Sequence, residues 1–265
     1  MPLSSKVQGN PNHPTLVFLH GFLGNVKDWS ETIDFLKDDY YCVSIDLPGH
    51  GGSVSIYPSQ GEGFEFCHHL ISDVLNDLHI TQFTFVAYSL GGRLALDYAR
   101  TQHDDRLQRL ILESCHTGLN NLQDKELRYQ HDLSWAQRFA TQGIIDTLFE
   151  WYDQAVFSSL NDQEKEKMVD KRSNNYGVYL ANILLLTSLS KQTDALPFLQ
   201  ENSKAEKPLP IYYCFGEKDT KFSKLAETLS TKTDIKLVEF KNVGHNIHHQ
   251  VPQQYAQIIK EIFKK

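Results

Sequence analysis

A serine, an aspartate and a histidine follow one another along the chain, each directly after a run of apolar residues. The serine is Ser89 in AYSLG, the aspartate is Asp219 in GEKDTKF, and the histidine is His245 in VGHNIHH. Small residues two positions before and after the serine permit the strained backbone of a sharp strand-to-helix turn. Because an imidazole oriented by a carboxylate can take a proton from a hydroxyl, the three residues predict catalysis by an activated serine.

Each of these residues also has an ordinary explanation when it is taken alone. Ser89 could be a passive turn residue, Asp219 a helix cap, and His245 one of the 12 histidines of the chain. Glu217 is expected to be a solvated neighbour of Asp219, and the two histidines that end VGHNIHH are expected at the surface. Their common order, Ser then Asp then His after successive strands, favours catalysis and is that of the α/β-hydrolase fold.

Two backbone amides would complete this arrangement. The turn HGFLGN follows an apolar run, and the amide of Phe22 within it could point at an oxygen that becomes negative during the reaction. The amide of Leu90, directly after the serine, would be the second donor. Together these groups predict an oxyanion hole beside Ser89.

The elements that must position these residues are short apolar runs that alternate with helix-length patterns. The runs are TLVFLH, YCVSID, FTFVAY, RLILES, IYYCFG and KLVEF, which start at residues 15, 41, 83, 109, 211 and 236. They are rich in β-branched and aromatic residues, as strands buried on both faces of a parallel sheet are. Between them, the spacing of Phe66, Leu70, Val74 and Leu78 predicts one of the helices. The alternation predicts an α/β fold with a mostly parallel, doubly wound sheet.

The alternation stops between residues 118 and 196, where helical spacings continue without a convincing strand. We expect this insertion to form a helical lid over the carboxyl ends of the strands, where open α/β sheets bind their ligands. Residues 1–117 and 197–265 would then form the α/β-hydrolase core.

Composition excludes some classes of partner. The formal net charge of −7 argues against nucleic acid or an anionic membrane surface as the main partner. The first residues contain no apolar core of a signal peptide, and no window of about 18 apolar residues predicts a membrane span. The four cysteines are far apart, so we expect them to be reduced and structural in a cytoplasmic protein. No obligate protein partner is evident.

Arg93 follows the serine by four residues, so the two lie on the same face of the predicted helix, about one turn apart. A cation this close to a helix N-terminus opposes the helix macrodipole, so we expect an anion to compensate it. That anion is either a carboxylate of the protein, such as Asp97, or a carboxylate of a ligand.

The chain resembles the 2-succinyl-6-hydroxy-2,4-cyclohexadiene-1-carboxylate synthases of menaquinone biosynthesis over nearly its whole length. The resemblance rests on YSLGGR, DLPGHGGS, RSNNYG and EWYDQAVFSSLN, of which the last two lie in the insertion. It implies a lyase that eliminates pyruvate from 2-succinyl-5-enolpyruvyl-6-hydroxy-3-cyclohexene-1-carboxylate, with the activated serine as the base and without a metal or organic cofactor. Ala87 departs from the glycine expected before the serine.

The resemblance also implies which residues bind this small polycarboxylate. Arginines of the core and lid would hold its carboxylates, and these are Arg93, Arg128 and Arg172; Tyr88 and Trp151 match further positions of the pocket. Planar guanidinium groups suit two-point recognition of carboxylates. Without the resemblance, Arg128 and Arg172 would be taken for exposed residues of lid helices.

Two other classes of function stay open. The same triad could serve a carboxylesterase, a thioesterase or a C–C hydrolase, because the fold supports many reactions. A non-catalytic binding protein of the hydrolase fold is the second alternative, although a complete Ser, Asp and His set argues against it.

Overall fold

The computed structural model describes residues 2–57 and 63–264, and this part of the chain forms a seven-stranded sheet. The strands are β1 (Ser5–Gln8), β2 (Thr15–Leu19), β3 (Tyr41–Ile45), β4 (Phe83–Tyr88), β5 (Leu107–Glu113), β6 (Ile211–Gly216) and β7 (Lys236–Phe240). They lie in the order β1-β3-β2-β4-β5-β6-β7. β1 runs antiparallel to β3 and every other pair is parallel. The mostly parallel, doubly wound sheet predicted from the sequence is confirmed.

The edge strand β1 is the one strand that the apolar runs did not predict. Its sequence is Ser-Lys-Val-Gln, and its first three residues are exposed. β1 pairs only with β3, where Ser5 lies opposite Ile45. An edge strand with one solvated face carries no continuous apolar run, so hydropathy gives no signal for it.

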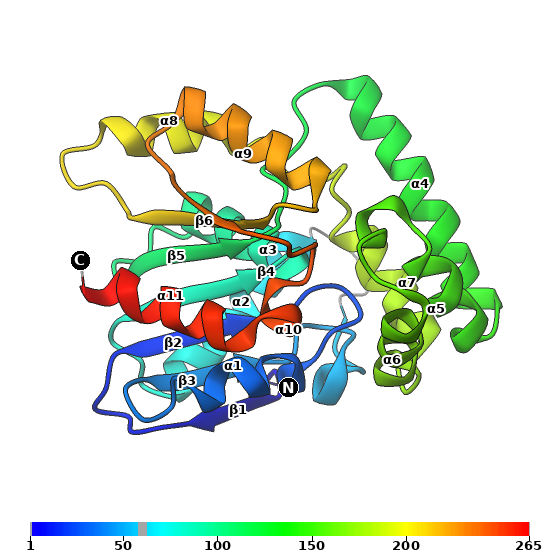
Figure 1. Ribbon diagram of the computed structural model, residues 1–265, viewed down its shortest axis with the longest axis horizontal. Helices are drawn as coiled ribbons and strands as arrows, with labels where there is room; N and C mark the ends of the chain where they lie inside the picture. Colours follow the sequence, from blue (N-terminus) through cyan, green and yellow to red (C-terminus); the bar gives the residue numbers. More distant parts are fainter. Residues whose placement is uncertain (1, 58–62, 265) are drawn as a thin grey trace.

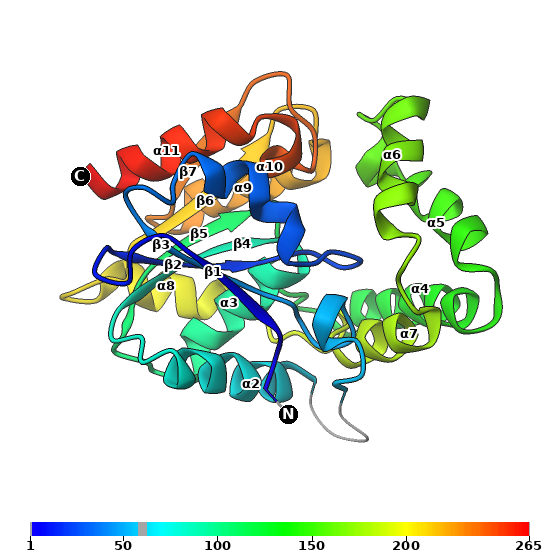
Figure 2. The same ribbon diagram turned by 90° about the horizontal axis from the view of Figure 1, so that it is seen from below.

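Helices cover both faces of the sheet. One face packs against α1 (Ser30–Asp34), α10 (Ile247–Gln250) and α11 (Pro252–Lys264). The other packs against α2 (Gly63–Asp77), α3 (Leu90–Thr101), α8 (Leu196–Lys204) and α9 (Thr220–Lys232). Figure 2 shows α1 and α11 on one side of the strands and α2, α3 and α8 on the other. Each face therefore has its own apolar core.

The remaining helices lie between β5 and β6 in the chain and gather beyond one end of the sheet (Figure 1). They are α4 (Leu122–Thr141), α5 (Ile144–Tyr152), α6 (Asp162–Arg172) and α7 (Gly177–Leu186). A third apolar cluster holds them together, with Phe139, Leu148 and Leu180 among its buried members. The core loop after β2 contributes Leu23 to the same cluster. We call these four helices the lid; the division of the chain at residues 118 and 196 stays a prediction.

The spacing that predicted α2 only partly matches the burial of its apolar residues. Of the four residues whose spacing predicted this helix, only Val74 is buried, and the other three are half-buried. The apolar side chains buried in the core are Phe64, Cys67, Ile71, Val74 and Leu75, and the half-buried Leu70 and Leu78 pack against it. Apolar residues occur on more than one face of α2, so their spacing predicts a helix without determining which face turns inward.

Candidate active site

Ser89 lies at the sharp turn from β4 into α3 and has backbone angles of φ 49° and ψ −107°. This left-handed conformation is strained for a residue with a side chain. A Cβ atom on Gly91 would lie 2.5 Å from the carbonyl oxygen of Leu19, so only glycine fits there. Ala87 is the second-last residue of β4, and its methyl group is fully buried in the core. The turn therefore forms with alanine at the position where a glycine was expected.

His245 and Asp219 form the second part of the site. The Nδ1 atom of His245 lies 2.5 Å from Oδ2 of Asp219, and both side chains are buried. The other carboxylate oxygen of Asp219 accepts the backbone N–H of Phe222 at 3.3 Å and so caps α9. Asp219 thus combines the two roles that the sequence left as alternatives. The rings of Phe157 and Phe222 enclose the imidazole, at centroid distances of 5.8 and 5.0 Å.

A cavity of about 630 Å³ brings the serine and the histidine together beneath the lid. Ser89 and His245 both line it, although no hydrogen bond joins them in the described part of the chain. Catalytic hydrogen bonds are often long without a ligand and shorten when the substrate binds. Five other sequence-predicted site residues line the same cavity: Phe22, Leu90, Arg93, Arg128 and Trp151. Tyr88, Arg172 and Asp219 do not.

The backbone N–H groups of Phe22 and Leu90 are free to act as donors, since neither has an acceptor among the described residues. The turn that carries Phe22 is held by the next residue, Leu23, whose N–H donates to Nε2 of His50 at 3.1 Å. Burial lowers the pKa of His50 to about 3, so its ring is neutral and can accept this bond. The two free amides at the serine support the predicted oxyanion hole.

Arg93 has no carboxylate partner among the described residues. One of its guanidinium nitrogens donates to the carbonyl oxygen of Thr187 at 2.8 Å. The predicted alternative, an ion pair with Asp97, is wrong, because Asp97 pairs with Arg100 at 2.7 Å instead. Desolvation, together with the nearby charge of Arg128, lowers the pKa of Arg93 to about 10, so the group remains charged at neutral pH. A half-buried cation is therefore available to a ligand.

Arg128 comes from the lid helix α4 and faces the same cavity. Its Nε atom donates to Oδ1 of Asp132 at 2.8 Å, and Asp132 in turn accepts the hydroxyl of Ser188 at 2.7 Å. This bond occupies one side of the planar fork, and the terminal nitrogens have no partner among the described residues. The explanation of Arg128 as an ordinary surface residue does not hold.

Arg172 is not brought to the cavity. Its guanidinium donates to Oδ1 of Asp28 at 2.8 Å, and both side chains are at least 96% buried. The pair joins lid helix α6 to the short 3-10 helix η1 (Val26–Trp29) of the core. This placement differs from the prediction that Arg172 joins Arg93 and Arg128 around a ligand. It arises because η1 offers a buried carboxylate that the sequence pattern did not reveal.

Asp28 should contribute strongly to stability because of this pair. Replacing it with alanine would leave the Arg172 charge buried and unpaired, and we expect a loss of about 3 kcal/mol in the free energy of unfolding, measured in urea. Burial would raise the pKa of Asp28, but Arg172 and His249 lower it far below its ordinary value. The contribution is therefore present above the unfolded-state pKa of about 3.9 and is lost as the pH falls below it.

The matched control is Asp39→Ala, which removes an exposed partner of Lys260. Exposed pairs contribute about 0–1 kcal/mol, so this variant should unfold almost as the wild type does. Equal losses in the two variants at neutral pH would contradict the importance of the Asp28–Arg172 pair. A difference between wild type and Asp28→Ala that does not shrink in acid would contradict its ionic nature.

His248 was expected at the surface, and this prediction is wrong, whereas His249 is only half-buried and lines a hollow beside α6. Nδ1 of His248 lies 2.7 Å from Oε1 of Glu113, and both side chains are fully enclosed. The ring of Tyr88 lies against both His245 and His248, at centroid distances of 5.3 and 4.7 Å. Tyr88 therefore packs against the imidazole of His245 and lies outside the cavity lining.

Lys221 and His116 line the cavity and were not predicted. Desolvation, with Lys221 and Arg93 nearby, lowers the pKa of His116 to about 3, so its ring is neutral. Lys221 stands in the first turn of α9, two residues after Asp219. Like Arg93, Lys221 is a cation near a helix N-terminus, so the same sequence signal could have identified it.

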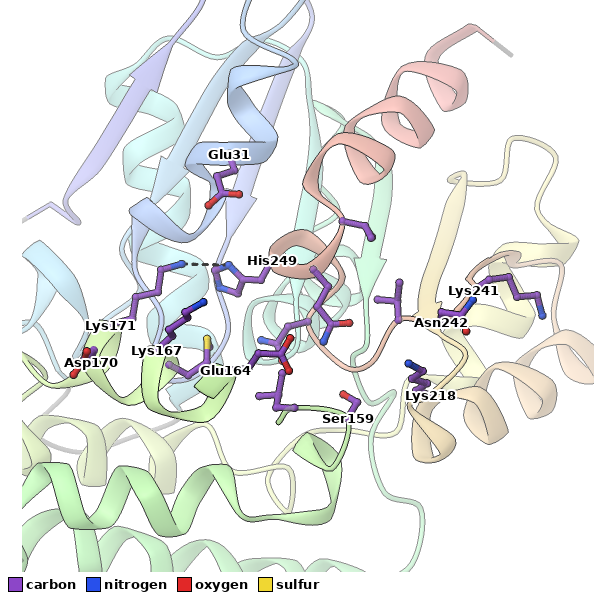
Figure 3. A pocket seen from close by; sticks show the side chains of 16 residues that line it. Glu31, Ser159, Glu164, Lys167, Asp170, Lys171, Lys218, Lys241, Asn242 and His249 are labelled. Carbon is purple, nitrogen blue, oxygen red and sulfur yellow. Dashed lines mark hydrogen bonds between the residues drawn. The ribbon is translucent and has the colours of Figure 1, made fainter. Parts of the chain in front are cut away.

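A second hollow, of about 780 Å³, lies between α6 and the core. Figure 3 shows its wall, where Lys171 of α6 contacts Nδ1 of His249 at 3.4 Å. Charges of both signs line it, among them Glu164 and Lys167, and no member of the Ser89, Asp219 and His245 set does. Because Ser89 and His245 line only the smaller cavity of about 630 Å³, that cavity is the candidate active site.

Comparisons with known proteins agree with this geometry. Residues 14–252 match the family model of the alpha/beta hydrolase fold. A protein of Escherichia coli strain SMS-3-5 named 2-succinyl-6-hydroxy-2,4-cyclohexadiene-1-carboxylate synthase is 38% identical, over 97% of this chain and 96% of its own length. A protein of Enterobacter sp. strain 638 with the same name is 35% identical, over 100% and 97%. The solved structure of MenH from S. aureus has a TM-score of 0.87 at 26% identity and covers 98% of this chain and 97% of its own.

Proposed function

The chain belongs to the α/β-hydrolase fold family and, within it, to the 2-succinyl-6-hydroxy-2,4-cyclohexadiene-1-carboxylate synthases, and from this we propose how it works. The enzyme is a lyase of menaquinone biosynthesis. It eliminates pyruvate from 2-succinyl-5-enolpyruvyl-6-hydroxy-3-cyclohexene-1-carboxylate. The cavity at Ser89 is the active site.

The observation that carries this proposal is that two arginines with N–H donors unoccupied in the described part of the chain line the same cavity as Ser89 and His245. Arg93 donates only to a backbone carbonyl, and Arg128 keeps its terminal nitrogens free within the described residues. The rest of the cavity wall is largely apolar, with Val156, Leu184 and Leu189 among its residues, so these cations are what distinguish it from a pocket for a neutral ester or a lipid. Two guanidinium groups beside an activated serine fit a substrate with several carboxylates.

In the proposed reaction, Asp219 holds His245, and His245 takes the proton of Ser89 so that the serine oxygen acts as a base. The base removes the ring hydrogen beside the succinyl carbonyl. The electrons of that C–H bond move through the ring, the double bond shifts, and the C–O bond to the enolpyruvyl group breaks. The leaving enolate takes up a proton to become pyruvate, so neither water nor a cofactor is consumed.

The remaining groups would stabilise and orient the reacting ring. Charge that develops on the succinyl carbonyl oxygen would be met by the N–H groups of Phe22 and Leu90. Arg93 and Arg128 would hold carboxylates, and Trp151, which packs on Phe22 at a centroid distance of 5.1 Å, would form an aromatic wall. A fixed ring keeps the acidic hydrogen within reach of the serine.

The proposal also places the enzyme in the cytoplasm, with a small free polycarboxylate as its substrate. Support comes from the four cysteines, which are buried and unpaired as expected in a reducing compartment. No helix in the described part of the chain has both the length and the apolar character to cross a bilayer. The proposal involves neither a nucleic acid nor an obligate protein partner.

The direct test is pyruvate release from the enolpyruvyl substrate, with Arg93→Ala as the diagnostic variant. Losing a charge-assisted bond should cost about 1.5–3 kcal/mol, or roughly 10- to 150-fold in kcat/KM. We expect a higher KM and a lower kcat, because a misplaced ring misplaces its acidic hydrogen. Arg93→Lys should recover only part of the loss, since an ammonium group lacks the planar fork.

An uncharged ester offered to the same variants is the control. It has no carboxylate to lose, so any slow hydrolysis should be little changed by Arg93→Ala. Equal damage to both substrates, together with a lower melting temperature, would make Arg93 a structural residue. Rapid ester hydrolysis without pyruvate release would favour an esterase instead.

A further inference from the structure

The substrate of the proposed reaction carries three carboxylates, and the two cavity arginines match only two of them. One carboxylate is on the ring, one ends the succinyl chain and one belongs to the enolpyruvyl group. Arg93 and Arg128 line the cavity, whereas Arg172 is held by Asp28 outside it. A third anion that is desolvated without a cation would weaken binding considerably. The cavity must therefore offer another positive group.

Lys221 is the third cation of the cavity wall. It is the second residue of α9, where its positive charge opposes the helix macrodipole. It has no carboxylate within ion-pair distance among the described residues, and its ammonium lies 5.3 Å from the ring centre of its neighbour Phe222. Desolvation and the charge of Arg128 lower the pKa of Lys221, although Asp219 acts in the opposite direction. An anionic ligand would relieve this local excess of positive charge.

We propose that Lys221 binds the third carboxylate of the substrate and so completes a set of three cations with Arg93 and Arg128. This inference rests on the proposed function. Lys221 is then a substrate-positioning residue, whose flexible ammonium accepts a carboxylate without the fixed geometry of a guanidinium fork. Arg172, held by Asp28, is not a member of this set.

A competing role would be electrostatic support of the triad through Asp219, which lies two residues before Lys221 in the same turn. The two roles predict different results. A lysine that supports Asp219 would affect every substrate of the triad and would shift the pH profile of kcat. A lysine that binds a carboxylate would affect only the anionic substrate and mainly its KM.

The test compares Lys221→Met, which keeps the length of the side chain without its charge, with Lys221→Arg and Lys224→Met. Both lysines are exposed, but Lys224, one turn further along α9, does not line the cavity, so it is the matched control. We expect Lys221→Met to lower kcat/KM for pyruvate release about 10- to 100-fold, mostly through KM. Lys221→Arg should retain most activity, and Lys224→Met should stay within about twofold of the wild type.

Stability and a neutral ester separate binding from structure. Removing a cation from the first turn of a helix should leave the melting temperature of Lys221→Met unchanged or raise it. Hydrolysis of an uncharged ester should be unaffected. A shifted pH profile, impaired ester hydrolysis, a lower melting temperature, or a KM within twofold of the wild type would each overturn the inference while the wild type still releases pyruvate. No pyruvate from the wild type would overturn the proposed function and, with it, this inference.

Discussion

Ser89→Ala is expected to lower kcat for pyruvate release by about 10⁴-fold while KM changes little. The serine oxygen is the proposed base, and general-base catalysis contributes on the order of 10²–10⁴-fold. A methyl group cannot accept the ring proton, whereas the arginines that hold the substrate are untouched. The strained turn should survive, because alanine is smaller than serine and the neighbouring Gly91 remains.

The double variant Ser89→Ala, His245→Ala shows whether the two residues act as one relay. Groups that act as a unit are not additive, so the double variant should be only slightly slower than Ser89→Ala alone. Substrate binding, measured by titration into Ser89→Ala, should stay near the wild-type KM. If Ser89→Ala alone kept activity within tenfold of the wild type, the serine would not be the base, and His245 would take that role.

The sheet could be predicted from the sequence because its strands are buried on both faces. Such strands are nearly continuous apolar runs, and all six predicted runs are strands in the structure. β1 was missed because Val7 is its one apolar residue and is itself exposed. The spacing in α2 predicted the helix but not which of its apolar residues are most buried, because they occur on more than one face. Hydropathy thus predicts elements better than it predicts their orientation.

Site residues could be predicted from the sequence where they directly follow a strand. Ser89, Asp219 and His245 each follow a strand, and parallel strands bring their carboxyl ends to one edge of the sheet. Arg172 could not be placed in this way, because its partner Asp28 lies 144 residues away in sequence. The burial of His248 depends likewise on Glu113, which is 135 residues distant. Pairings between remote segments leave no local pattern to read.

Asp219→Asn should lower kcat by about 10³-fold and leave stability nearly unchanged. Asparagine is as good a helix cap as aspartate, so the bond to the backbone N–H of Phe222 can persist. Its amide group, however, can donate a hydrogen bond toward Nδ1 of His245, where the carboxylate now accepts one. That change favours the wrong tautomer of the imidazole, which can no longer accept the serine proton. This variant therefore separates the two roles of the Asp219 carboxylate, which are to cap α9 and to orient His245.

Glu217→Gln is the matched control, since Glu217 lies two residues earlier in the same loop. Its carboxylate is exposed, accepts the N–H of Asn242 at 2.9 Å and pairs with Lys241 at 3.3 Å. It has no contact with His245, so this variant should keep kcat within about twofold of the wild type. If Glu217→Gln were the more damaging change, the acid of the triad would have been assigned to the wrong carboxylate. If both changes were harmless, His245 would act without an orienting acid, and the short Asp219–His245 contact would only cap and close the loop.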